Sequence, residues 1–150
     1  MLALIYARAN KRPEAKKEIE EARTVARGLG GDRNDFNLEF GPTNVEIQAV
    51  STAVELGDAG EAVEIGQGID AGGLSAERRA RLLVDLGRAY VQRRHPGEAL
   101  DCLLQAEELA PETIRSHIAA RAAINELVLI SGGAASPELL GLAERADARE

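Results

Sequence analysis

Residues 80–113 have the sequence ARLLVDLGRAYVQRRHPGEALDCLLQAEELAPET, the most informative stretch of the chain. Its apolar residues recur at intervals of three and four on both sides of Pro96, which is the spacing of amphipathic helices. Gly87 and Ala99 are small where two such helices would touch. Pro111 ends the second run, because proline is not tolerated in a helix interior. The stretch therefore predicts an antiparallel hairpin of two helices.

Helical spacing continues through the rest of the chain, and no segment shows the sustained alternation typical of strands. All five prolines lie between the apolar-periodic segments. Thr43 and Glu46 have the spacing of a capping box, and Ser75 and Ser136 are suitable N-caps. We therefore expect eight helices. They cover about residues 1–10, 13–29, 43–57, 60–70, 75–94, 97–110, 117–131 and 137–147.

A short pattern occurs twice in the chain. Residues 60–63 read GEAV and residues 97–100 read GEAL, and their alanines lie 37 positions apart. Self-similarity of this period indicates stacked repeats. In residues 80–113, eight residues also resemble one tetratricopeptide (TPR) repeat in order and spacing. These residues are Leu83, Leu86, Gly87, Tyr90, Ala99, Leu103, Ala106 and Pro111.

The TPR resemblance implies an all-α fold, in which antiparallel helix hairpins stack into a right-handed α-solenoid and form a single domain over residues 1–150. The hairpins cover about residues 1–29, 43–70, 75–110 and 117–147. The last hairpin is expected to be a terminal cap. The second is expected to be thinly packed, because Ala53 and Gly66 stand where the third has Tyr90 and Leu103.

Three further strings are FGPTNV at residues 40–45, ELGD at 55–58 and LS at 74–75. They are similar to the C-terminal TPR-like region of certain bacterial transcriptional regulators, in which a helix-turn-helix domain precedes a sensor or dimerisation region. This resemblance implies a role in transcription regulation, with a protein or peptide segment as partner. The 150 residues leave no room for the DNA-binding part. We therefore expect either a fragment of such a regulator or a stand-alone relative.

The composition argues against several other classes of protein. The net charge is −7 at pH 7, which disfavours direct contact with nucleic acid despite the arginines between residues 78 and 94. No apolar run approaches the ~18 residues of a membrane-spanning helix. The first residues lack the basic start of a signal peptide, so we expect a cytoplasmic protein with no membrane partner. One cysteine and two histidines are too few for an internal disulfide or an ordinary zinc site.

No motif predicts catalysis. Gly66 and Gly68 match a dinucleotide-binding glycine pattern, but they lie in a predicted helix and not between a strand and a helix. His95 and His117 are expected to be solvated or to cap helices, because the sequence fixes no nucleophile beside them. Cys102 is expected to be a packed residue. We therefore predict a protein that is not an enzyme, with no catalytic, cofactor-binding or metal site.

The predicted binding surface is a groove. In a TPR-type stack the first helix of each hairpin lines the concave side, and such surfaces bind partners. Polar residues form stripes at helical spacing on the helices expected at 43–57, 75–94 and 117–131. The predicted groove residues are Asn44, Gln48, Ser51, Glu55, Arg81, Asp85, Arg88, Gln92, Arg121 and Asn125. A merely solvated stripe is the alternative interpretation.

The first six residues, MLALIY, leave no helical face polar. Leu2 and Tyr6 are expected to face inward onto the next helix, which leaves Leu4 and Ile5 uncovered. Because uncovered apolar side chains favour association, these two residues predict a two-fold homodimer. The alternative to a groove-binding module is therefore a stand-alone oligomeric scaffold with no groove ligand.

Overall fold

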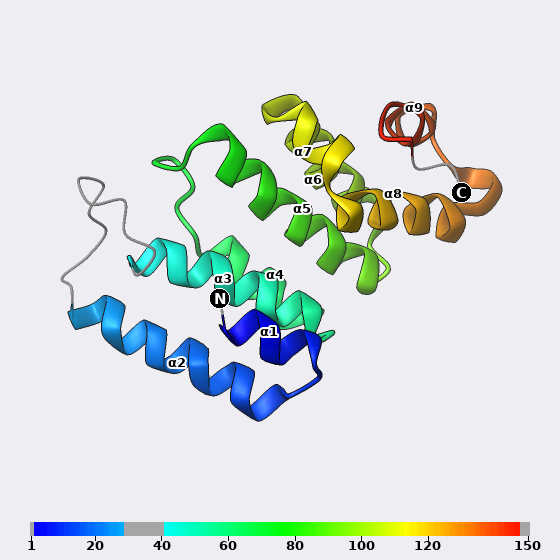
Figure 1. Cartoon of the computed structure of the whole chain (residues 1–150). Helices are drawn as coiled ribbons and strands as arrows, with labels where there is room; N and C mark the ends of the chain where they lie inside the picture. Colours follow the sequence, from blue (N-terminus) through cyan, green and yellow to red (C-terminus); the bar gives the residue numbers. More distant parts are fainter. Residues whose placement is uncertain (1, 29–40, 148–150) are drawn as a thin grey trace. The chain divides into compact units, whose positions relative to one another are not determined.

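The computed structural model describes residues 2–28 and 41–147, and this part of the chain is all-helical, without a strand. The expected all-α fold class is confirmed. Phe40 and the predicted helix ends at residues 1 and 29 lie outside the described residues. The chain divides into two compact units, Met1–Asp70 and Ala71–Glu150, each with its own set of helices (Figure 1).

Over residues 2–28 and 41–70, the first unit contains two helix hairpins. One pairs α1 (Leu2–Arg8) with α2 (Arg12–Gly28), and the other pairs α3 (Pro42–Glu55) with α4 (Ala59–Gln67). α3 packs against both helices of the preceding hairpin, as the first helix of a repeat does when neighbouring hairpins share a core. Small buried residues allow the helices to lie close together. They include Ala3, Ala15, Ala49, Ala53 and Ala62.

α1 turns a different face inward from the one expected. Its buried residues are Ala3 and Ala7, whereas Leu2 is exposed and Tyr6 is half-buried. The expectation that Leu2 faces inward is therefore wrong. Ala3 belongs to a buried cluster with Ile19. A small side chain at this contact lets the short helix lie close to its neighbours, so the face with the smallest residues is the one that packs.

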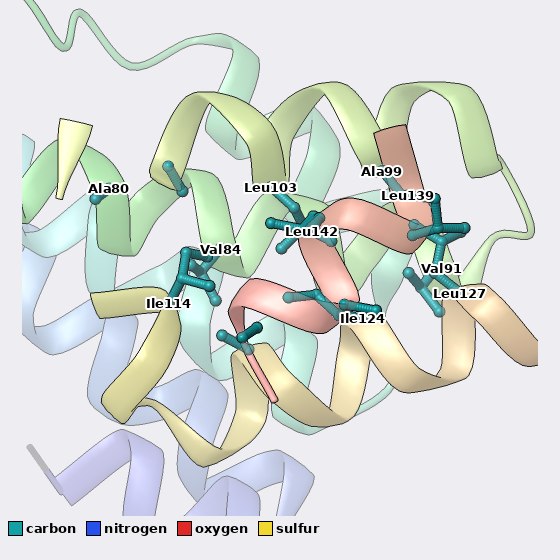
Figure 2. Close-up of a cluster of buried hydrophobic side chains, with 14 residues drawn as sticks. Ala80, Val84, Val91, Ala99, Leu103, Ile114, Ile124, Leu127, Leu139 and Leu142 are labelled. Carbon is teal, nitrogen blue, oxygen red and sulfur yellow. The ribbon is translucent and has the colours of Figure 1, made fainter. Parts of the chain in front are cut away.

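The second unit contains five helices, and a 3₁₀ turn at Gly132–Ala134 precedes the last of them. The helices are α5 (Ala76–Gln92), α6 (Pro96–Leu109), α7 (Pro111–Ser116), α8 (Ile118–Ser131) and α9 (Pro137–Arg145). α5 pairs with α6, α8 pairs with α9, and α8 also contacts both α5 and α6. All five helices contribute to one buried cluster (Figure 2). Its larger members are Val84, Val91, Leu103, Ile114, Ile124, Leu127, Leu139 and Leu142.

α5 and α6 approach closely at Gly87, as the sequence predicts. A Cβ atom built on Gly87 would lie 3.0 Å from Cγ of Leu103 and 3.5 Å from the carbonyl oxygen of Ala99. Leu103 and Ala99 are both fully buried. A side chain at position 87 would therefore have to displace Leu103, and the hairpin keeps its close contact because this residue is glycine.

Two predicted helix starts are confirmed. Oγ of Ser75 accepts a hydrogen bond from the backbone N–H of Arg78 at 3.2 Å and caps α5. Oγ of Ser136 accepts one from the backbone N–H of Leu139 at 3.1 Å and caps α9, with Pro137 in the first turn. These caps satisfy N–H groups that have no partner inside the helix.

The capping box predicted at Thr43 and Glu46 is wrong. α3 begins one residue earlier, with Gly41 as N-cap and Pro42 at the first helical position. Proline suits that position, because its fixed φ angle is helical and no N–H needs a partner there. The carboxylate of Glu46 instead binds the guanidinium of Arg23 on α2. A tertiary ion pair thus uses the side chain that the local motif would have required.

α7 was not among the eight expected helices, and the described residues contain nine. Pro111 follows the end of α6, as expected, but it is also the first residue of α7. Ile114 lies in the middle of this helix and is 1% exposed, within the core of the second unit. Six residues form too short a helix to be stable alone, so burial of Ile114 is what holds it.

Candidate functional site: a hollow between α2 and α4

The predicted groove residues differ in how accessible they are. On α5, Arg81 and Gln92 are exposed, Arg88 is half-buried and Asp85 is buried. The residues predicted on α3 and α8 are all half-buried. They are Asn44, Gln48, Ser51, Glu55, Arg121 and Asn125. The expectation that the α5 stripe faces away from the packing surface is therefore wrong for Asp85.

Asp85 and Arg88 form an ion pair, with 3.2 Å between Oδ1 of Asp85 and Nη1 of Arg88. The two side chains are only 12% and 18% exposed. A paired and largely covered guanidinium is less available to an external carboxylate than a free one. In contrast, Oε1 of Gln48 and Nε of Arg121 are buried atoms that have no hydrogen-bond partner among the described residues. These two atoms of the predicted stripes could each still form a hydrogen bond, which buried polar atoms usually do.

A site that the sequence did not predict lies in the first unit, where α2 and α4 flank α3. Two hollows adjoin there, with volumes of about 250 Å³ and 670 Å³. Both are lined by Arg23, Glu61 and Ile65, so they form one continuous depression. We call it the α2–α4 hollow. Since α2 and α4 are the second helices of their hairpins, this surface is not the one predicted for the groove.

The smaller end of the hollow has an apolar floor. α2 contributes Ile19, α3 contributes Ala49 and Ala53, and Leu56 follows the end of α3. Ile19, Ala49 and Ala53 are buried, while Leu56 is half-buried. Because the α3 residues beneath α2 and α4 are mainly alanines, no large side chain fills the space between these two helices. The depression is thus a direct consequence of small residues on α3.

Ion pairs link α2 to the start of α4 beside the smaller end of the hollow. Arg12 and Lys16 of α2 both bind Asp58, which precedes α4, and Nζ of Lys16 lies 3.1 Å from Oε2 of Glu61 on α4. An Nη atom of Arg12 also donates to the carbonyl oxygen of Leu56 at 3.1 Å. The hydrogen bond from Arg12 lowers the pKa of Asp58 below its ordinary value, so this carboxyl is ionised at neutral pH. The pairs join α2 to α4 without filling the space between them.

Arg23 occupies the middle of the hollow. Its guanidinium donates to both carboxylate oxygens of Glu46, at 2.9 Å and 2.8 Å, and to Glu20 at 2.6 Å. The hydrogen bonds from Arg23 to Glu46 raise the pKa of Arg23 further above its usual value. A two-pronged contact between a guanidinium and a carboxylate fixes both side chains. The positive charge of Arg23 is therefore already neutralised by residues of the same unit.

The larger end of the hollow, with a volume of about 670 Å³, is acidic. Glu61, Glu64 and Asp70 line it together with Glu46, and Arg23 is the only cation among the lining residues that the structure describes. Glu64 is exposed and makes no ion pair among the described residues. Carboxylates gathered around an apolar depression create a negative potential over it. The hollow thus combines a small apolar end with a larger acidic end.

The histidines and the cysteine have structural surroundings. Nδ1 of His117 accepts a hydrogen bond from the backbone N–H of Ala120 and caps α8, while Nδ1 of His95 lies 3.4 Å from Glu98. Burial raises the pKa of the Cys102 thiol to about 11, so the thiol stays protonated at neutral pH, which reduces its nucleophilicity. Over residues 2–28 and 41–147, no group of three or more His, Cys, Asp or Glu side chains is placed to hold a metal ion.

No family model, curated protein or solved structure matches this chain. None of the described helices combines the length and the apolar character needed to cross a membrane.

The sequence contained an indirect signal for the α2–α4 hollow. The second hairpin is predicted to be thinly packed, because Ala53 and Gly66 occupy positions where the third hairpin has large residues. Ala53 lines the hollow in the structure. The small residues of the second hairpin thus indicated that side chains do not fill the space there. The charged residues around the hollow come from α2 and α4, and spacing along the chain could not predict that they lie close together.

Proposed function

We propose that this chain is a non-enzymatic, TPR-like interaction module that binds a protein or peptide segment. The proposal extends to a role as the sensor or dimerisation region of a bacterial transcriptional regulator, which rests on the sequence resemblances. The helix hairpins and the glycine contact between α5 and α6 are compatible with TPR-like packing. Proteins built from stacked helix hairpins use extended concave surfaces for binding.

The observation that supports a binding function best is the α2–α4 hollow. It is a concave surface with an apolar floor and a charged rim, which are the features of sites that bind a segment of another chain. The predicted polar stripe of α8 is the second surface to consider, because Nε of Arg121 is a buried atom without a hydrogen-bond partner among the described residues. The test below therefore reports on both surfaces.

Selection of peptides from a random displayed library on the immobilised full chain tests the proposal without assuming a partner. We expect enriched peptides to bind as synthetic copies in fluorescence anisotropy titrations. Backbone amide chemical shifts are expected to change around Ala53 and Ile65, since these residues line the hollow. Changes confined to Arg81, Arg121 and Asn125 would move the site to the predicted stripes. Failure to enrich any binding peptide would contradict the module.

An oligomeric scaffold is the second candidate function. Leu2 and Ile5 on α1 are 45% and 60% exposed, so two large apolar side chains of one short helix are in water. Leu4, which the sequence also placed in this surface, is half-buried. Exposed apolar side chains gain about 1.5–3 kcal/mol each when they are fully buried, so α1 is a plausible contact between copies.

Leu2→Glu combined with Ile5→Lys is expected to convert a dimeric chain to a monomer in sedimentation velocity. These two substitutions together leave the net charge unchanged and do not alter the half-buried Leu4, so we expect little change in the free energy of unfolding. Ile118→Lys combined with Leu129→Glu is the matched control, because these α8 residues are 76% and 71% exposed and the charges introduced are the same. A monomeric wild type, or a dimer that survives the α1 changes, would rule out association through α1.

A further inference from the structure

We infer that the α2–α4 hollow binds a short peptide segment in which large apolar residues adjoin lysine or arginine. This inference rests on the proposed function, because it specifies the partner of a binding module. It assigns the site to the flank formed by the second helices of two hairpins and not to the predicted polar stripes.

The apolar part of the ligand follows from the floor of the hollow. The smaller end has a volume of about 250 Å³ and is lined by Ile19, Ala49, Ala53, Leu56 and Ile65 among its apolar residues. A dry cavity of about 150 Å³ lined by aliphatic residues is large enough to hold benzene. The smaller end therefore has room for one large aliphatic or aromatic side chain. The polar residues that line this end already have partners within the unit: Lys16 binds Glu61, Arg23 binds Glu20 and Glu46, and Thr52 donates to the carbonyl oxygen of Gln48. Polar ligand atoms placed there would therefore lose water without gaining partners from the apolar floor.

The basic part of the ligand follows from the charges around the hollow. Among the described residues that line the hollow there are two cations, and both are already paired within the unit: Lys16 binds Glu61, and Arg23 binds Glu46. The carboxylates outnumber these cations. They are Glu20, Glu46, Glu61, Glu64 and Asp70. An acidic ligand would meet this surplus of like charge, whereas lysine or arginine would be attracted to it.

The arrangement of the two ends sets the order of residues in the ligand. Ala49 and Ala53 line only the apolar end, while Glu64 and Asp70 line only the acidic end. Because the two ends share Arg23, Glu61 and Ile65, one segment can occupy both. Its apolar side chain would enter the smaller end, and its basic side chains would lie over Glu64 and Asp70. A segment with only the apolar side chain, or with only the basic side chains, would occupy one end of the hollow and leave the other end empty.

Three short synthetic peptides test this assignment on the full chain by fluorescence anisotropy at about 0.15 M salt. The first carries two leucines flanked by lysine and arginine, the second has serine in place of leucine, and the third has glutamate in place of every basic residue. We expect the first to bind, and the other two to bind at least ten-fold more weakly. Raising the salt to about 1 M shortens the Debye length to about 3 Å and should weaken the first several-fold.

Glu64→Lys gives the site-specific test. Glu64 is exposed, lies in the last turn of α4 and makes no ion pair among the described residues, so its reversal should leave the fold intact. We expect the first peptide to bind about three- to ten-fold more weakly, as one exposed attraction becomes a repulsion. Glu108→Lys is the matched control: it is exposed in the last turn of α6 in the other unit, and the charge change is equal. It should leave affinity unchanged.

The outcomes separate this inference from the proposed function. Equal weakening by Glu64→Lys and Glu108→Lys would show a general charge effect and overturn the assignment to the hollow. Equal binding of the basic and acidic peptides would overturn the basic ligand, while peptide binding as such would still support the module. If no peptide of the panel binds but the library selection yields others, the inference fails and the module remains. If neither yields a ligand, both fail.

Discussion

Leu103→Ala is expected to lower the free energy of unfolding of the second unit by about 3–5 kcal/mol. Leu103 is fully buried in the core cluster, and its side chain lies against Gly87 at the closest contact between α5 and α6. Truncation removes the transfer free energy of the side chain and leaves a cavity. α5 has no Cβ at position 87 with which to fill it. Urea unfolding followed by circular dichroism measures the loss.

Leu140→Ala is the control for Leu103→Ala. It makes the same chemical change on α9, where the side chain is 51% exposed, so we expect a loss below about 1 kcal/mol. Equal losses for the two variants would contradict the central position of Leu103. Because the chain has two compact units, each unfolding transition in the urea curve is to be fitted on its own.

Ile114→Ala is expected to lower the free energy of unfolding of the second unit by about 2–4 kcal/mol. Ile114 is 1% exposed and is the buried residue of α7, so it is the main apolar link between this short helix and the core. Loss of that link should release α7 as well as leave a cavity, because six residues do not form a stable helix alone. Denaturant unfolding measures the global effect.

Amide hydrogen exchange distinguishes release of α7 from a simple cavity. We expect faster exchange at the backbone amide of His117, which donates to Thr113, and little change within α6. Thr113→Ala is the control, since it makes a change in the same helix at a half-buried side chain. If His117 exchanges at the wild-type rate in Ile114→Ala, α7 is held by other contacts.

Local interactions explain which features were accessible from the sequence. The helical spacing around Gly87 and the serine caps of α5 and α9 depend on residues within a few positions of one another, so the pattern contains the relevant information. The close contact at Gly87 follows from two features of one hairpin, a small residue on one helix and leucine on the next. These features predicted the all-helical class and most helix bounds to within a few residues.

The incorrect predictions concern segments in which the local sequence allows more than one packing face or side-chain partner, and tertiary contacts select among them. The first six residues of the chain have no polar face, so their pattern does not select which residues turn inward, and close packing by Ala3 selects them. Glu46 has the spacing of a capping residue, but a guanidinium from α2 binds its carboxylate instead. α7 has too few residues to show a helical period, and its burial decides its conformation.

The sequence by itself determined that this chain folds into helix hairpins, where most of their helices begin and that one hairpin has a close contact at Gly87, because each of these depends on spacing along one segment. Only the tertiary structure decided that α2 and α4 stand apart over the alanines of α3. It also brought Lys16, Arg23 and Glu61 together around the resulting hollow. These residues come from helices far apart in the sequence, and their convergence depends on how the helices pack.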